Sequence, residues 1–211
     1  MNKNFAFFGT PYVAKDTLDI LFSRGFMPTV IVTSADRPAG RGMKMQSSPV
    51  KDWTLEHKIP ILQPEKIDSI FEKELAAYDC PLAIVVAYGK ILPQSFIESF
   101  PLGVLNIHYS LLPKYRGASP VESALLAGDK ETGVTIQKMV YELDAGDIIR
   151  MDTVSILPDD NTTTLRARLI KIGAEILADT LPDYVAGKIV PAPQDHTQAT
   201  KSGKMKKEDG D

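Results

Sequence analysis

Residues 82–87, Leu-Ala-Ile-Val-Val-Ala, form the most continuous apolar run in the chain. Such a run is typical of a central parallel strand that is covered on both faces. It leads into Tyr88-Gly89-Lys90, which leaves the backbone open at the carboxyl end of the predicted strand. Because open α/β sheets bind ligands outside these ends, where the strand order changes, the run indicates both a fold class and a ligand-binding edge.

A strand–helix–strand pattern near the N-terminus supports this fold class. Phe5–Phe8 predicts a short buried strand, a helical pattern runs from Val13 to Gly25, and Thr29–Thr33 is a second β-branched run. Such a unit favours parallel strands. We therefore predict an α/β fold, a Rossmann-like open and mostly parallel twisted sheet with helices on both faces. The fingerprint G-x-G-x-x-G is missing after the first strand, which argues against a nicotinamide dehydrogenase.

Composition limits the classes of protein further. The 211 residues suffice for one α/β domain with a full core, and a formal net charge of -3 argues against a generally basic nucleic-acid binder. The single cysteine, Cys80, is expected to be buried and inert. Three widely separated histidines offer no metal-ligand cluster. We expect a soluble, cytoplasmic, monomeric protein without a metal site.

Residues 34–51 predict a long loop without regular secondary structure. It contains one acidic residue and four basic ones, Arg37, Arg41, Lys44 and Lys51. Loops of this length are usually functional or disordered, and glycine-flanked arginines can follow a phosphate backbone. The pattern alone is equally compatible with a nucleic-acid contact and with an ordinary solvated loop.

Asn106 and His108 stand two residues apart at the end of a predicted strand that follows Gly103. Residues i and i+2 share a strand face, so both side chains can point at the same place. An amide donor beside a titratable ring could polarise a carbonyl and stabilise an oxyanion. No serine or cysteine has an evident nucleophile context, which favours direct attack by a substrate nucleophile over an acyl-enzyme. A structural role for the histidine stays open.

Asp144 lies in the glycine-containing loop Leu143–Asp147, which leads into another predicted strand. Its carboxylate could orient the imidazole or take a proton from an attacking amine through water. Most loop aspartates are turn formers, so the local pattern leaves both roles open. Downstream, Asp159–Thr163 predicts the N-cap region of a long amphipathic helix, with Leu165, Leu169, Ile172, Ile176 and Leu177 on one face. From Pro191 the pattern dissolves, and the end of the chain resembles a linker or a frayed terminus.

Residues 106–120 resemble the signature of the formyltransferases that use 10-formyltetrahydrofolate. Further segments are similar, in the same order, to the methionyl-tRNA formyltransferases of that family: Phe8–Pro11, Asp36–Gly42, Val86–Gly89, Gly133–Ile136 and Leu143–Asp147. The resemblance covers the chain to about Lys207 and implies two parts. Residues 1–190 would be the catalytic domain, and residues 191–211 a linker to a C-terminal β-barrel domain that this chain lacks.

The resemblance also implies site residues. Asn106, His108 and Asp144 would catalyse transfer of a formyl group from 10-formyltetrahydrofolate to the amino group of methionyl-initiator tRNA, for translation initiation. The residues implied in folate binding are Val86, Tyr88, Gly89, Ile91, Leu92, Ser110, Leu111, Leu112 and Pro113. Those implied in tRNA binding are Arg37, Arg41 and Lys44, in a segment that would enter the acceptor-stem region.

Two other functions stay open at this stage. A formyltransferase acting on a small amine, such as glycinamide ribonucleotide or an amino-sugar nucleotide, would share the same Asn, His and Asp. It would not be expected to carry the basic segment between Arg37 and Lys51. A non-catalytic folate-binding module is the other alternative, and the intact set of three residues argues against it.

Overall fold

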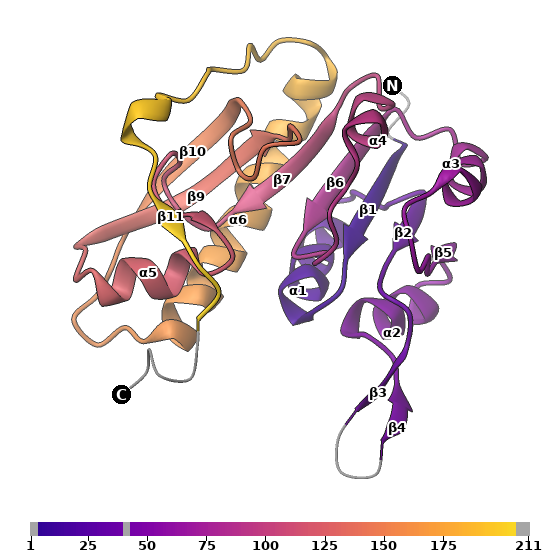
Figure 1. Cartoon of the computed structure of the whole chain (residues 1–211), viewed down its shortest axis with the longest axis horizontal. Coiled ribbons are helices and arrows are strands. Elements are labelled where there is room, and N and C mark those ends of the chain that lie inside the picture. Colours follow the sequence, from indigo (N-terminus) through magenta and orange to yellow (C-terminus); the bar gives the residue numbers. More distant parts are fainter. Residues whose placement is uncertain (1–3, 40–42, 206–211) are drawn as a thin grey trace. The chain divides into compact units, whose positions relative to one another are not determined.

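A computed structural model of the chain describes residues 4–39 and 43–205 (Figure 1). Its main sheet has seven strands in the order β10-β9-β7-β6-β1-β2-β5. This arrangement confirms the predicted open, mostly parallel α/β sheet. The chain forms two compact units, residues 1–105 and residues 106–211, and each is described by itself below.

Unit 1 is a parallel α/β unit. Its elements are β1 (Phe5–Gly9), α1 (Tyr12–Ser23), β2 (Val30–Val32), β3 (Arg37–Ala39), β4 (Lys44–Gln46), α2 (Pro49–Glu56), β5 (Ile61–Leu62), α3 (Ser69–Ala76), β6 (Leu82–Val86) and α4 (Gln94–Glu98), and β7 (Val104–His108) begins at its end. All residues of β1 and β6 are buried, as their apolar runs predict. The Phe8 ring packs edge-on against Tyr88 and Phe96, with ring centroids 5.4 Å and 5.9 Å apart, and anchors this core.

The strand order of unit 1 reverses beside β1, because β2 and β5 lie on one side of it and β6 on the other. Gly9 lets these elements approach closely, since an added Cβ would lie 2.5 Å from Cβ of Ala14 and 3.0 Å from the carbonyl oxygen of Val86. The Thr10 hydroxyl then donates to the Tyr88 carbonyl oxygen over 3.2 Å. This contact fixes the turn after β6, which is the predicted ligand-binding edge.

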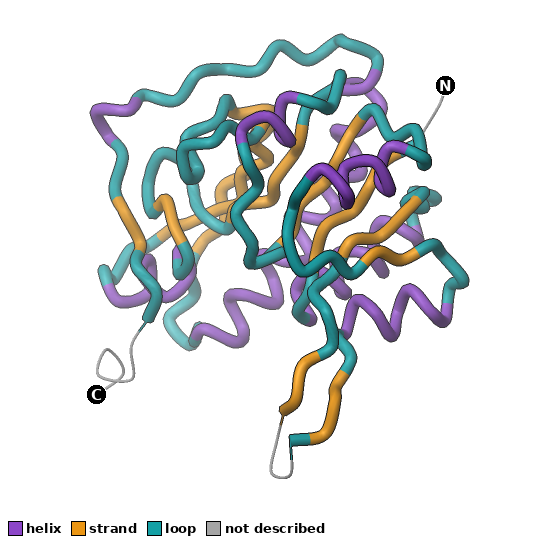
Figure 2. The backbone as a smooth tube through the Cα atoms, turned by 45° about the vertical axis from the view of Figure 1, so that its right-hand side comes forward, coloured by secondary structure: helices purple, strands orange, loops and turns teal. Residues whose placement is uncertain are grey.

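Residues 37–39 and 44–46 pair as the two strands of a small antiparallel sheet, so the expectation of a loop without regular secondary structure is wrong. Strands β3 and β4 pair antiparallel, with Arg37 opposite Gln46, and Figure 2 shows them extending from the rest of their unit. The side chains of Met43 and Met45 are 69% and 63% exposed. Backbone hydrogen bonds join the two strands. Because this pairing does not depend on an apolar face, the segment has no apolar periodicity from which strands could be predicted.

Unit 2 packs one long helix against a small sheet. Its elements after β7 are β8 (Arg116–Gly117), α5 (Pro120–Leu126), β9 (Glu131–Lys138), β10 (Ile148–Ser155), α6 (Thr162–Val185), a short 3₁₀ helix (His196–Gln198) and β11 (Lys201–Ser202). The predicted N-cap of the long helix is confirmed, because the Asn161 side chain accepts from the backbone N–H groups of Thr163 and Thr164. Gly173 brings α6 against Ile107 and Val134, where an added Cβ would lie 2.9 Å and 3.0 Å from their methyl groups.

The stretch after α6 carries more structure than its composition predicts. Ala192 exchanges backbone hydrogen bonds with Ile148, and β11 pairs parallel with β8, with Ser202 opposite Gly117. Gly117 has a φ of 128°, and an added Cβ would lie 2.0 Å from the Ser202 carbonyl oxygen. The stretch is therefore fastened by backbone bonds and polar side chains, which a hydrophobicity pattern does not detect. That residues 191–211 lead to a further domain stays a prediction.

Two expectations from composition can be compared with the structure. Cys80 is half-buried rather than buried, and burial raises the pKa of its thiol to about 11, so the thiol stays protonated and unreactive at neutral pH. Across residues 4–39 and 43–205, no helix is both long and apolar enough to cross a membrane.

Candidate active site

Strand β7 presents Asn106 and His108 on one face, as their spacing predicts. The Asn106 side-chain oxygen Oδ1 is buried and has no hydrogen-bond partner among the residues that the structure describes. A buried acceptor of this kind costs stability unless something completes it. The unpartnered Oδ1 therefore marks a place where a hydrogen-bond donor of a ligand can bind.

The His108 ring is 5% exposed and lies between two oxygen acceptors. Its Nε2 lies 2.9 Å from the carbonyl oxygen of Tyr115 and donates a hydrogen bond to it. Its Nδ1 faces Oδ2 of Asp144 at 3.6 Å, a separation typical of an ion pair rather than a hydrogen bond. Nε2 is therefore the ring nitrogen fixed by the backbone, and Nδ1 is the one that faces the carboxylate.

Asp144 turns its carboxylate inward, and the side chain is 10% exposed. Its Oδ2 accepts from the backbone N–H of Gly117 and its Oδ1 from Nε2 of Gln137, both over 2.8 Å. The residue also adopts a φ of 50°, so it is a turn former as well as a partner of His108. The structure thus shows a turn conformation and a contact with His108 in one residue, and its part in proton transfer stays a prediction.

A close backbone approach explains the glycine of the Asp144 loop. An added Cβ at Gly146 would lie 1.8 Å from the carbonyl oxygen of Lys138, at the end of β9. No side chain fits there. Gly146 therefore holds the loop directly against the strand that carries Gln137.

The segment from Ser110 to Pro113 is fastened from within unit 2. Ser110 donates its hydroxyl to the Lys114 carbonyl oxygen over 2.6 Å, and its own carbonyl accepts from the Thr135 hydroxyl over 2.7 Å. Leu112 is buried, and its N–H donates to the same threonine hydroxyl. These contacts account for the shape of the segment, and its folate-binding role stays a prediction.

In unit 1, the turn after β6 mixes buried and open positions. Val86, Tyr88 and Leu92 are buried, whereas the Ile91 side chain is 82% exposed. Burial raises the pKa of the Tyr88 hydroxyl to about 12. Gly89 has a φ of 80°, and an added Cβ there would meet open space. The turn thus offers an exposed apolar side chain and uncovered backbone to a ligand.

The residues predicted to bind tRNA lie in the β3–β4 segment. Arg37 is exposed at the start of β3, Lys44 begins β4, and Arg41 lies outside the described residues. Lys51, the fourth basic residue of this segment, pairs with Asp36 over 2.6 Å. Hydrogen bonds from Lys51 and then from Gln63 lower the pKa of the Asp36 carboxyl. The charge of Lys51 is therefore matched within unit 1, and it is a weaker candidate for a phosphate contact.

Sequence reasoning missed Gln137, Gly117, Arg116 and Gln194, all of which lie around Asp144. Gln137 shares a strand face with Thr135, and a glutamine inside an otherwise buried strand is a signal that could have identified it. Gly117 acts through its backbone, and Gln194 follows a proline-rich stretch. Neither carries a local signal.

A match to a family model decides the family of the chain. The model described as "Formyl transferase" matches residues 3–181. The chain belongs to the formyl transferase family. The chain is 44% identical over 204 residues to a methionyl-tRNA formyltransferase of Bdellovibrio bacteriovorus. This alignment covers 95% of the chain and 64% of the relative. The chain is 48% identical over 195 residues to one of Listeria monocytogenes, covering 92% and 62%. The chain thus spans just under two thirds of these relatives.

Solved formyl transferases share the fold. A phosphoribosylglycinamide formyltransferase from Bacillus halodurans matches with a TM-score of 0.72 and 22% identity, covering 87% of the chain and 95% of that structure. A sugar 3N-formyl transferase, solved in the presence of dTDP and 5-N-formyl-THF, matches with a TM-score of 0.71 and 19% identity, covering 95% and 69%. At this identity the likeness supports the architecture of the formyl transferase, and its substrates need a separate argument.

Proposed function

We propose that this chain transfers the formyl group of 10-formyltetrahydrofolate to the amino group of methionyl-initiator tRNA, as a cytoplasmic monomer. The observation that carries the proposal is the group of Asn106, His108 and Asp144 in unit 2. Asn106, whose Oδ1 is buried without a described partner, shares a face of β7 with His108, and His108 faces Asp144. The relatives that are 44% and 48% identical are named methionyl-tRNA formyltransferase, which supports the choice of acceptor.

The reaction forms a bond between the amine nitrogen and the formyl carbon, and breaks the bond from that carbon to N10 of the folate. As negative charge develops on the formyl oxygen, Asn106 donates a hydrogen bond to it and protonated His108 stabilises it by its positive charge. An oxyanion donor contributes about 2.7–4 kcal/mol. Asp144 orients His108 and accepts, through water, the proton that the amine loses. That proton then reaches N10 as the folate leaves, so no charge accumulates.

Folate binding is assigned to two segments. The turn from Val86 to Leu92 supplies uncovered backbone at Gly89 and the exposed Ile91 side chain, which suit the edge and the face of a planar ring. Leu111 and Pro113 are the partly exposed members of the segment in unit 2. Ser110 already donates its hydroxyl to Lys114, so it acts by shaping its segment.

The test is to incubate the chain with 10-formyltetrahydrofolate and methionyl-initiator tRNA and to measure formyl-methionine released from the tRNA. We expect formylation of the charged tRNA. Glycinamide ribonucleotide and an amino-sugar nucleotide are tested in parallel. Formylation of these amines alone would replace the proposed acceptor by a small amine, and binding of folate without any product would favour a non-catalytic module.

Replacing Arg37 and Arg41 together by Ala is expected to raise KM for the tRNA while KM for the folate stays unchanged. Each phosphate contact that is lost lowers the slope of log K against log salt by about 1. The measurement is tRNA affinity as a function of salt concentration. Lys73→Ala, which removes a basic residue from the last turn of α3, is the matched control. An equal rise in both KM values would contradict the role assigned to the β3–β4 segment.

A further inference from the structure

We propose that Gln194, held by the buried side chain of Arg116, is a positioning residue for Asp144. The inference rests on the proposed function, because it concerns the residue that would orient His108 during formyl transfer. It makes the stretch after α6 a working part of the active site.

Gln194 fastens the backbone of the Asp144 loop. Its side chain is 5% exposed, and its Nε2 donates to the carbonyl oxygen of Asp144 over 2.9 Å and to that of Gly146 over 2.6 Å. One NH₂ group thus satisfies two carbonyls on either side of Ala145. Since Asp144 adopts a φ of 50°, the two hydrogen bonds hold the loop in a backbone conformation that non-glycine residues seldom take.

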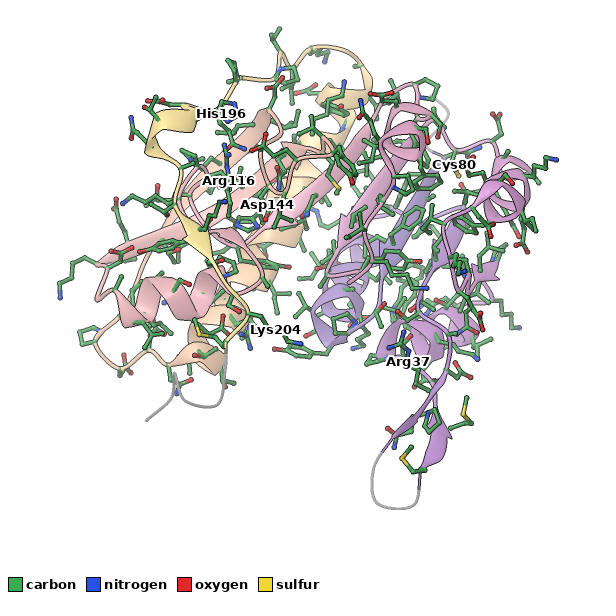
Figure 3. All side chains as sticks on the ribbon, viewed as in Figure 1. Arg37, Cys80, Arg116, Asp144, His196 and Lys204 are labelled. Carbon is green, nitrogen blue, oxygen red and sulfur yellow. The ribbon has the colours of Figure 1, made fainter. Side chains whose placement is uncertain are left out.

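Arg116 determines which way the Gln194 amide faces. The guanidinium is 8% exposed, and its Nε and Nη2 donate to Oε1 of Gln194 over 3.2 Å and 2.7 Å. Nη2 also donates to Nδ1 of His196 over 3.1 Å, and Oε1 of Glu142 lies 3.9 Å from Nη1. Figure 3 labels Arg116, His196 and Asp144. Arginine has donors only and a carbonyl only accepts, so the amide oxygen must face Arg116 and the NH₂ group must face the loop. A glutamine side chain therefore supplies both the acceptor that Arg116 needs and the donor that the loop carbonyls need.

The short strand β8 contributes to two of the attachments of Asp144. Arg116 and Gly117 form β8, and the Gly117 N–H donates to the Asp144 carboxylate over 2.8 Å. One residue of β8 therefore holds the carboxylate directly, and the other holds its backbone through Gln194. Loss of the Gln194 donors would let the loop move, and the carboxylate would then leave Gly117 and Nδ1 of His108. A misplacement of about 1 Å can cost about 100-fold in rate.

Gln194→Glu tests the inference. The glutamate keeps an oxygen that accepts from Arg116, but it replaces the NH₂ group, which donates to two carbonyls, by a second oxygen that cannot donate to them. We expect kcat for formyl transfer to fall by about 10- to 100-fold with KM for folate and tRNA unchanged. We also expect the ¹H–¹⁵N signal of the Gly117 amide to shift in the free protein, because its hydrogen bond to the carboxylate is lost. A merely structural role would leave that signal in place.

Gln198→Glu is the matched control, since it makes the same charge change on the same stretch at an exposed residue whose amide donates to Asp195. The double variant Arg116→Met/Gln194→Met covers the case in which Gln194→Glu does not fold. It removes the buried charge and its partner together, so no unpaired ion remains. It should show the same loss of kcat. Its Gly117 signal is not used, because the changed residue directly precedes Gly117.

An unchanged kcat in a folded Gln194 variant overturns the inference, and so does a loss of kcat with an unmoved Gly117 signal. The outcome is separable from that of the proposed function. If the unaltered chain forms no formyl-methionine, the proposed function fails, and the Gly117 signal alone decides whether Gln194 positions Asp144.

Discussion

Asp144→Asn is expected to lower kcat for formyl transfer by about 10²- to 10⁴-fold, the range typical of an acid–base group. The carboxylate accepts from two donors, the Gly117 N–H and Nε2 of Gln137. An asparagine has one acceptor and one donor, so one of these N–H groups would face another N–H. The carboxylate opposite Nδ1 of His108 is lost as well. His108→Ala is expected to show a loss of similar size, because both residues serve one proton path.

The measurement is single-turnover formyl transfer, with circular dichroism and thermal unfolding to confirm that each variant is folded. A mispaired buried donor costs about 1–3 kcal/mol, which is less than the stability of a typical domain. Asp147→Asn is the matched control, because this exposed aspartate lies three residues further along the same loop. Near-normal turnover by Asp144→Asn would remove the carboxylate from the mechanism.

The sheet and the shared face of Asn106 and His108 on β7 could be predicted because they depend on local patterns. Continuous apolar runs identified β1 and β6, and a spacing of two residues placed Asn106 and His108 on one face. Both arguments need only the periodicity of a strand. The same local reasoning could not decide whether Asp144 was a turn former or a partner of His108, because that depends on where its loop lies.

The supports of the site depend on contacts between residues far apart in the sequence. Gln194 reaches Asp144 across 50 positions, and Arg116 reaches Gln194 across 78. Polar side chains engaged in this way carry no periodicity, and the surrounding residues have the composition of a linker. The β3–β4 pair was missed for a related reason, since backbone hydrogen bonds define it. Contacts between polar residues far apart in the sequence are thus the part of the site that the sequence could not predict.

The difference between residues placed by a regular strand and a residue placed by distant polar contacts fits the proposed chemistry. The residues that would contact the formyl group lie on a regular strand, where backbone geometry fixes their direction. The residue that would manage the proton lies on a loop, and a loop needs external supports to be equally well placed. Gly117, Gln137 and Gln194 supply them. A chain that kept the Asn, His and Asp but lost these supports would be expected to bind substrate and turn it over slowly.

Asn106→Leu is expected to reduce kcat by about 10²- to 10³-fold, as for loss of one oxyanion donor. It should leave the free energy of unfolding unchanged or raise it by about 1 kcal/mol, because the buried Oδ1 has no partner among the described residues and such an atom carries a penalty of about 1–3 kcal/mol. Leucine has a similar shape and needs no hydrogen bond. Urea denaturation and single-turnover kinetics on the same preparations measure the two effects.

Opposite signs for activity and stability would separate a catalytic amide from a structural one. A structural asparagine would lose stability when its polar atoms are removed, and its activity would fall only as far as the folded population falls. Asn161→Leu provides that comparison, since the Asn161 side chain caps α6 through the N–H groups of Thr163 and Thr164. Removing such a cap costs about 0.5–2 kcal/mol. If Asn106→Leu behaved like this control, with lower stability and near-normal turnover, Asn106 would be part of the fold and the oxyanion would need another donor.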